Sequence, residues 1–168
     1  KLALRAQYEG YSKEAGVRAG SQTETYFRLE AQVSNSRWKG VPFFLESGKA
    51  MSESRCEINV YFKCAHHKSH FGRVAGAGSI LDKQNVLTFK IQPDEGISLQ
   101  FGAKVPGDEF RVQSVSMDFA YKQAFADSQE TDGYPRLLHD AMCGDPTLFI
   151  RTDEVEQAWR IVDPYLQA

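Results

Sequence analysis

Long apolar runs and clustered basic residues are both absent from this chain. No stretch reaches the roughly 18 apolar residues that a membrane-spanning helix needs, so we expect no membrane partner. Lysine and arginine together number 20 against 22 acidic residues. The resulting net charge of -2 argues against a nucleic-acid partner, because phosphate binding needs a concentrated basic face. No leader peptide is visible at Lys1-Leu2-Ala3, and we expect a segment cut from a longer protein.

Cysteine is scarce, and its spacing excludes the common two-cysteine metal and redox motifs. Cys56, Cys64 and Cys143 form no CxxC pair. A small odd number fits reduced intracellular thiols better than a disulfide framework, so we expect a cytoplasmic protein. With 42% hydrophobic and 25% charged residues over 168 positions, the composition is that of one globular domain with a large core.

Alternating apolar and polar residues dominate the first two thirds of the chain. Residues 1–22 have no steady period and are interpreted as a connecting segment, whereas residues 23–33 alternate as a half-buried strand does. Further strands are expected at 41–45, 58–62, 86–91, 97–101 and 110–117, with turn signals such as Pro93-Asp94-Glu95-Gly96 between them. Residues 65–84 are predicted to form a long loop. The stretch 23–118 is therefore predicted to form an antiparallel sheet.

The apolar spacing changes to three and four over residues 119–168, which are expected to be mainly helical. One helix is predicted around residues 134–142 with Gly144 as its stop. A second is predicted to begin at a capping Thr152, and Pro164 is expected to end or bend it. The buried stripe of the second would be Val155, Ala158, Trp159 and Val162. Too little chain separates the strands for helical crossovers. The predicted class is α+β: a single domain over residues 1–168, with one large, mostly antiparallel sheet and a few helices packed on one face.

Three motifs carry a resemblance to a known family. In chain order they are Arg37-Trp38-Lys39-Gly40-Val41-Pro42-Phe43-Phe44-Leu45-Glu46-Ser47-Gly48-Lys49, Ile91-Gln92-Pro93-Asp94-Glu95-Gly96-Ile97 and Asp140-Ala141-Met142-Cys143-Gly144-Asp145-Pro146-Thr147-Leu148-Phe149. In this order they closely resemble the C-terminal domain of glucose-6-phosphate dehydrogenase. The resemblance runs from Arg5 to Pro164 and corresponds to the C-terminal third of a typical member. It implies a homodimer, or a tetramer, assembled through the sheet.

Lys49 is the first candidate for a substrate contact. It follows Gly48 at a strand end, where its ammonium could reach a phosphate dianion. Taken alone, such a residue is more often a solvated loop lysine. In the resembled family, however, this motif carries a substrate-phosphate lysine, and Lys49 matches it. Members usually have a second basic residue five positions later, where this chain has Ser54; the adjacent Arg55 is the candidate replacement.

Gln92 is the second candidate. A side-chain amide both donates and accepts hydrogen bonds, so it can read sugar hydroxyls. The alternative is that Gln92 bonds within its own turn, since Pro93-Asp94-Glu95-Gly96 favours one. The resemblance implies a glutamine near the sugar at this position.

Several other groups have structural explanations. The run Cys64-Ala65-His66-His67-Lys68-Ser69-His70 holds potential zinc ligands but matches no standard spacing, so a polar loop is favoured and no metal is expected. The run Gly72-Arg73-Val74-Ala75-Gly76-Ala77-Gly78 lacks a full GxGxxG, and a hairpin loop is favoured. Turn and helix-start roles explain the acids Asp94, Glu95, Asp153 and Glu154.

Hydride transfer to a nicotinamide needs a dinucleotide fold and a base, and neither is recognisable here. The resemblance implies that both belong to an N-terminal domain that binds NADP. His66, His67, His70 and His139 match none of the family's catalytic positions, so no catalytic or cofactor-binding residue is assigned in this chain. Some members hold a second NADP here through clustered basic residues. The matching positions are Glu46, Arg55, Asn59 and Lys90; only two are basic, so we expect that site to be absent or weak.

The resemblance predicts the substrate-binding and dimerisation part of an oxidoreductase that oxidises glucose 6-phosphate to 6-phosphogluconolactone with NADP, the first step of the pentose phosphate pathway. The chain alone should be inactive. A non-catalytic oligomerisation module is the alternative, and Ser54 favours it. A stand-alone sugar-phosphate binder is a weaker third. NADP or NAD as acceptor, and dimer or tetramer as assembly, both stay open at this point.

Overall fold

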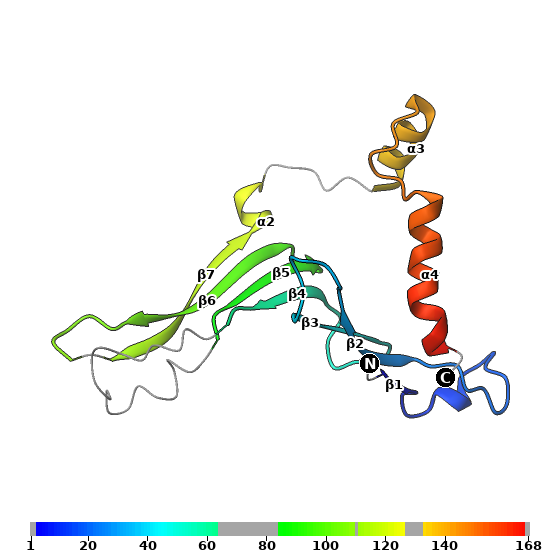
Figure 1. The fold of residues 1–168 in the computed structure, drawn as a ribbon, viewed down its shortest axis with the longest axis horizontal. Helices are drawn as coiled ribbons and strands as arrows, with labels where there is room; N and C mark the ends of the chain where they lie inside the picture. Colours follow the sequence, from blue (N-terminus) through cyan, green and yellow to red (C-terminus); the bar gives the residue numbers. More distant parts are fainter. Residues whose placement is uncertain (1–2, 64–83, 110, 127–132, 167–168) are drawn as a thin grey trace. The chain divides into compact units, whose positions relative to one another are not determined.

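Two compact units make up the chain. The computed structural model describes residues 3–63, 84–109, 111–126 and 133–166. The first unit combines Lys1–Ser52 with Thr131–Ala168, and the second consists of Glu53–Glu130. Figure 1 shows the elements of both units along the chain. None of the helices in the described ranges has the length and apolar character that a membrane crossing requires.

A three-stranded antiparallel sheet forms the strand part of the first unit. Its order is β1-β2-β3, with β1 at Ala3–Ala6, β2 at Tyr26–Gln32 and β3 at Pro42–Gly48. Leu29 lies opposite Leu45 and Ala31 lies opposite Phe43. These apolar residues therefore share one face, as the alternation over residues 23–33 predicts. A short 3₁₀ helix, η1 (Tyr11–Lys13), lies between β1 and β2.

Strand β1 was not apparent in the sequence, where residues 1–22 are interpreted as a connection. Ala3–Ala6 nevertheless pairs with β2 in antiparallel register, with Ala6 opposite Tyr26. Four residues contain only two alternations, too few to establish a period of two. Residues 3–6 therefore form an edge strand because they pair with the longer strand β2, and not because of their local propensity.

The second unit is a four-stranded antiparallel meander of order β4-β5-β6-β7 (Figure 1). Its strands are β4 (Cys56–Tyr61), β5 (Val86–Gln92), β6 (Gly96–Lys104) and β7 (Val112–Ala120), and the short helix α2 (Tyr121–Ala124) follows. The register sorts the residues into two faces. One apolar row across the sheet is Ile58, Phe89, Ile97 and Phe119, and the adjacent row on the opposite face is Asn59, Thr88, Ser98 and Asp118.

Gly96, at the start of β6, allows a close backbone approach between two strands of this sheet. It is buried, and a Cβ added to it would overlap the carbonyl oxygen of Phe119 on β7. Any other residue would push β6 and β7 apart next to the β5–β6 turn. The glycine in the Pro93-Asp94-Glu95-Gly96 sequence is therefore required by packing.

Two helices complete the first unit: α3 (Gly133–Cys143) and α4 (Thr152–Leu166). Gly144 ends α3 as predicted, with a left-handed φ of 70°. The amide of Gly144 donates to the Ala141 carbonyl at 3.2 Å, and that of Asp145 donates to the Asp140 carbonyl at 2.9 Å. This pair of bonds is the Schellman arrangement, which satisfies carbonyl groups left open at a helix end.

Helix α4 differs from its prediction at its start and along its apolar face. It begins at Thr152, so the capping position falls on Arg151. Pro164, which is expected to end or bend the helix, lies inside it. The stripe predicted to be buried is exposed: 56% of Trp159 and 41% of Val155 are accessible. Amphipathic spacing shows that a helix has an apolar face, but not which element covers it. The Arg5 guanidinium donates to the Leu166 carbonyl at 3.3 Å, linking the end of α4 to β1.

The α+β class and the antiparallel pairing are confirmed. The strands, however, divide into two sheets, where the sequence pattern predicts one large sheet. Alternation identifies individual strands and their buried faces, whereas the boundary between two ladders depends on which strands find partners.

Candidate functional site

Lys49 directly follows β3, at a point where the chain turns. Its amide donates to the carbonyl of Thr25 at 2.8 Å, which ties it to the start of β2. A Cβ at Gly48 would lie 2.9 Å from Cδ2 of Tyr26 and 3.0 Å from Sδ of Met51, so a side chain there would need both to move. Ala50 has a left-handed φ of 54°. The Gly48-Lys49 pair is thus a tight end to the strand that leaves Lys49 exposed.

The Lys49 ammonium has no hydrogen bond or ion pair with any residue in the described parts of the chain. An unpaired, exposed ammonium retains three donors and a full charge. Such a group can bind a phosphate dianion without first losing a carboxylate partner. The Lys49 ammonium is therefore available to a ligand, and its phosphate contact stays a prediction.

Gln92 is the last residue of β5, and it pairs with Cys56 at the start of β4. The peptide bond between Gln92 and Pro93 is cis. The side chain is exposed, and its amide forms no hydrogen bond within the described ranges. In the turn that follows, the Glu95 carbonyl accepts a hydrogen bond from the Tyr121 amide at 3.0 Å. The Gln92 amide therefore makes no hydrogen bond to its own turn within the described residues.

Arg55 differs from Lys49 because carboxylates already surround it. Its Nη1 lies 3.2 Å from Glu53 Oε2, and its Nε lies 3.7 Å from Glu57 Oε1. The side chain is 60% exposed, and exposed pairs of this kind contribute at most about 1 kcal/mol. A phosphate could therefore displace these contacts, but the two acids would oppose its approach.

The structure brings two of the three candidates together. Arg55 immediately precedes Cys56, and Cys56 pairs with Gln92, so Arg55 and Gln92 lie at one end of the second unit's sheet. Lys49 belongs to the first unit, at the end of β3.

A polar network covers the face of the second sheet that contains Asn59 and Lys90. Asn59 donates to Glu57 at 2.8 Å and accepts from the Thr88 hydroxyl at 2.7 Å. Hydrogen bonds from Ser98 and Ser116, helped by the charge of Lys90, lower the pKa of Asp118 below its usual range. This network could not be read from the sequence, because its members come from four strands.

Glu46, the remaining position of the expected second NADP site, accepts a hydrogen bond from the Tyr26 hydroxyl at 2.9 Å. That bond, more than desolvation, raises the pKa of Tyr26. Glu46 and Asn59 are thus acidic and neutral groups engaged with neighbours of their own. The absence or weakness of the second site stays a prediction.

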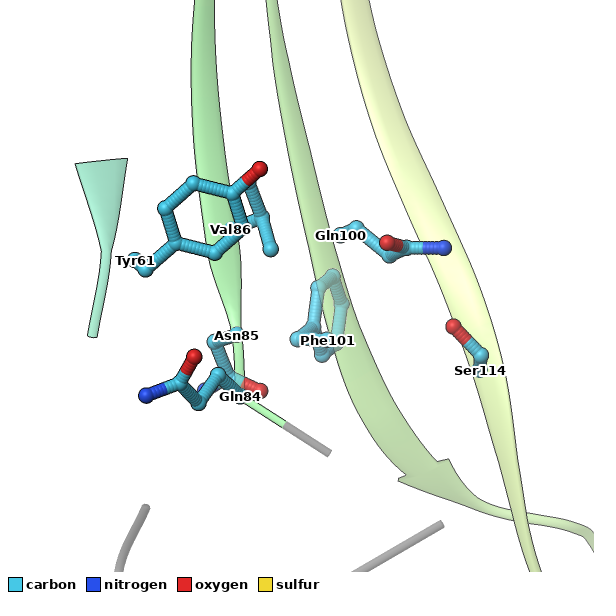
Figure 2. Close-up of a pocket in the computed structure, with 7 residues that line it drawn as sticks. All are labelled: Tyr61, Gln84, Asn85, Val86, Gln100, Phe101 and Ser114. Carbon is cyan, nitrogen blue, oxygen red and sulfur yellow. The ribbon is translucent and has the colours of Figure 1, made fainter. Parts of the chain in front are cut away.

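A shallow groove of about 260 Å³ lies elsewhere on the second unit, as Figure 2 shows. Its lining consists of Tyr61, Gln84, Asn85, Val86, Gln100, Phe101 and Ser114. Tyr61 pairs with Val86 at the end of the β4–β5 ladder opposite to Cys56 and Gln92. Strand β5 separates the two ends by about 20 Å, given the rise of each residue. The groove is neutral and distant from Arg55 and Gln92, so it is not their site.

The predicted loop at residues 65–84 and the Cys64–His70 and Gly72–Gly78 runs lie outside the described residues, apart from Gln84. Within the described ranges, no three potential metal ligands gather at one place.

A family comparison identifies the relatives of this arrangement. The family model described as "Glucose-6-phosphate dehydrogenase, C-terminal domain" matches residues 1–168. The chain belongs to the glucose-6-phosphate dehydrogenase family. The sequence resemblance is therefore confirmed over the whole chain, and with it membership of an oxidoreductase family.

Curated relatives of the glucose-6-phosphate dehydrogenase family match most of this chain. Glucose-6-phosphate 1-dehydrogenase of Aggregatibacter actinomycetemcomitans is 45% identical over 158 residues, which cover 94% of this chain and 30% of the relative. Glucose-6-phosphate 1-dehydrogenase 2 of Mycobacterium tuberculosis is 39% identical over 160 residues, again 94% and 30%. The chain thus spans about a third of the length of these relatives.

Solved glucose-6-phosphate dehydrogenase structures share the fold. The enzyme from Mycobacterium avium matches with a TM-score of 0.78 at 33% identity, covering 98% of this chain and 33% of the other. A glucose-6-phosphate dehydrogenase in complex with its substrate glucose-6-phosphate matches with a TM-score of 0.83 at 29% identity, covering 98% and 34%. These matches agree with the α+β architecture described above.

Proposed function

We propose that this chain is the substrate-binding and dimerisation part of an enzyme that oxidises glucose 6-phosphate to 6-phosphogluconolactone with NADP as hydride acceptor. The observation that carries the proposal is the similarity to a structure that holds glucose 6-phosphate, with a TM-score of 0.83 over 98% of the chain. The unpaired Lys49 ammonium and Gln92 amide support it, since both groups are available to a sugar phosphate.

Each candidate has a distinct part in this proposal. Lys49 binds the substrate phosphate through a charge-assisted hydrogen bond, and Gln92 bonds to sugar hydroxyls. Arg55 supplies a second phosphate contact once the ligand phosphate has displaced its ion pairs with Glu53 and Glu57. None of the three removes a proton or accepts the hydride, so their work is binding and orientation.

NADP is proposed to bind mainly outside these residues, because no glycine-rich dinucleotide fingerprint occurs among them. The 168-residue chain by itself should therefore not turn over glucose 6-phosphate. We keep a cytoplasmic location, and the lack of nucleic-acid, membrane and metal partners, as predictions.

Assembly is proposed to use the apolar face of the second unit's sheet. Ile58 is 57% exposed and Met117 63% exposed on that face. Contiguous apolar surface of more than a few hundred Å² marks an interaction site in most soluble proteins. A homodimer is the simplest symmetric assembly, and pairs of dimers would make a tetramer.

The phosphate contact is tested by replacing Lys49 with alanine in the complete dehydrogenase. We expect the KM for glucose 6-phosphate to rise roughly ten- to a hundredfold, as loss of a charge-assisted bond implies. The KM for NADP should barely change. Steady-state kinetics with both substrates varied would measure the two effects.

Lys39→Ala is the matched control, because Lys39 is another exposed lysine of the first unit. It should leave both constants unchanged. Equal KM values for the Lys49→Ala and parent enzymes would overturn the assignment of Lys49.

An oligomerisation module without an active site is the second candidate function. Ser54 and the two acids beside Arg55 favour it, because they weaken the second phosphate contact. Isothermal titration of glucose 6-phosphate into the complete protein separates the two: the module would show no binding heat, whereas the enzyme should bind.

A further inference from the structure

A cluster of nucleophilic and titratable side chains lies on α3 and includes none of the candidate substrate contacts. Cys143, the last residue of α3, is an exposed free thiol. Its Sγ lies 3.7 Å from Nε2 and 3.9 Å from Nδ1 of His139. The residues are four apart, so one helical turn places their side chains on the same face.

Asp140 also lies beside the imidazole. Its carboxylate is almost fully buried, with 2% of the residue exposed. Oδ1 lies 2.9 Å from Nε of Arg136 and 3.5 Å from Nδ1 of His139. An Nδ1–H directed towards Asp140 leaves Nε2, the ring nitrogen closer to the sulfur, as the acceptor. Cys143 thus has an imidazole beside it, and a carboxylate lies 3.5 Å from Nδ1 of that imidazole.

We propose that Cys143 is a covalent modification site for small disulfides, with His139 accepting the thiol proton. The Cys143 sulfur attacks one sulfur of a disulfide R–S–S–R as its proton passes to Nε2 of His139. The disulfide bond breaks, one half becomes bonded to Cys143, and the other half leaves as a thiolate that takes up the proton. Cys143 is oxidised to a mixed disulfide, and the small disulfide is reduced to one thiol.

Cys56 provides an internal comparison. It is also an exposed free thiol, at the start of β4, but none of the described residues places an imidazole beside it. Since both thiols are open to solvent, a difference in their rates would report the neighbour rather than access.

The test measures each thiol separately. The purified chain is incubated with glutathione disulfide at neutral pH, quenched at intervals, digested, and the Cys143 and Cys56 peptides are quantified by mass spectrometry. We expect Cys143 to react about tenfold faster than Cys56, less than the effect of a base in an enclosed active site because both groups are exposed. His139→Gln should bring Cys143 to the rate of Cys56, since an amide keeps the polarity but cannot accept a proton.

Two controls separate the base from general effects on the helix. Leu138→Gln introduces the same amide at an exposed neighbouring position of α3 and should leave the Cys143 rate unchanged. In strong denaturant, where the helical pairing is lost, the two thiols should react equally. The proposal is overturned if Cys143 reacts no faster than Cys56 in the folded chain, or if His139→Gln and Leu138→Gln slow it to the same extent.

Discussion

At the scale of single residues, Arg55 shows how neighbouring acids weaken a candidate phosphate contact. Glu53 and Glu57 both contact its guanidinium, at 3.2 and 3.7 Å. We expect Arg55→Ala in the complete enzyme to raise the KM for glucose 6-phosphate only about two- to fivefold, because the ligand must displace weak exposed pairs worth under about 1 kcal/mol. Steady-state kinetics beside Lys49→Ala would measure this.

Glu53→Gln is the matched change in the opposite direction. Removing one of the opposing charges should lower the same KM by a similar factor. If Arg55→Ala and Glu53→Gln both leave the KM unchanged, Ser54 marks a lost contact and Lys49 alone binds the phosphate in this domain.

Asp118 provides a pH-dependent contribution at the same scale. Hydrogen bonds from Ser98 and Ser116 lower its pKa, so the ionised form is favoured in the folded state. Its stabilising effect is present above the ordinary carboxyl pKa of about 4 and is lost as pH falls through the lower folded value. In urea unfolding, Asp118→Asn should therefore have a lower free energy of unfolding than the parent at about pH 7, and this difference should shrink below about pH 4.

Asp108→Asn is the control for that series, because the Asp108 carboxylate is exposed and forms no hydrogen bond within the described ranges. It should cause no deficit at about pH 7. A deficit for Asp118→Asn that persisted unchanged at about pH 2 would show that the side chain acts by packing instead of charge.

At the scale of elements, the two ends of α3 offer a test of backbone conformation. Gly144 has a φ of 70° and nothing within 4 Å of the place that a Cβ would take, so Gly144→Ala should destabilise only through the left-handed backbone, by about 1 kcal/mol. Gly133 has the same open space and begins the helix without a left-handed φ. Gly133→Ala should be neutral or slightly stabilising. Urea unfolding would measure the free energy of unfolding of both variants, which should be lower for Gly144→Ala than for Gly133→Ala.

The ease of predicting each element follows from how local its causes are. Gly144 could be identified as a helix stop because its role depends on residues within one turn. The pairing of strand β1 and the exposure of Trp159 depend on distant chain segments. Such segments produce no periodic pattern in the residues themselves. The same holds for the candidate site. Motifs predict Lys49 and Gln92, whereas the acids that contact Arg55 and the row through Asn59 and Asp118 appear only in the folded chain.

At the scale of the whole molecule, the second unit's sheet presents two chemically different faces. The polar row through Asn59 and Ser98 satisfies its own hydrogen bonds, so it can face water. The opposite face exposes large apolar side chains such as Ile58 and Met117. In an antiparallel sheet one hydrated face is common, but the other needs a cover. This asymmetry, rather than total hydrophobicity, points to a specific contact surface.

Association through the apolar face makes the last prediction. The parent chain should sediment as a dimer at tens of micromolar, roughly the range in which weak specific interfaces form. Met117→Glu places a charge on the apolar face and should shift the chain to monomer, because burying an unpaired carboxylate is costly. Gln100→Glu adds the same charge to the polar face of the same sheet and should leave the dimer intact. A parent chain that stays monomeric, or a dimer that survives Met117→Glu, would exclude this face as the interface.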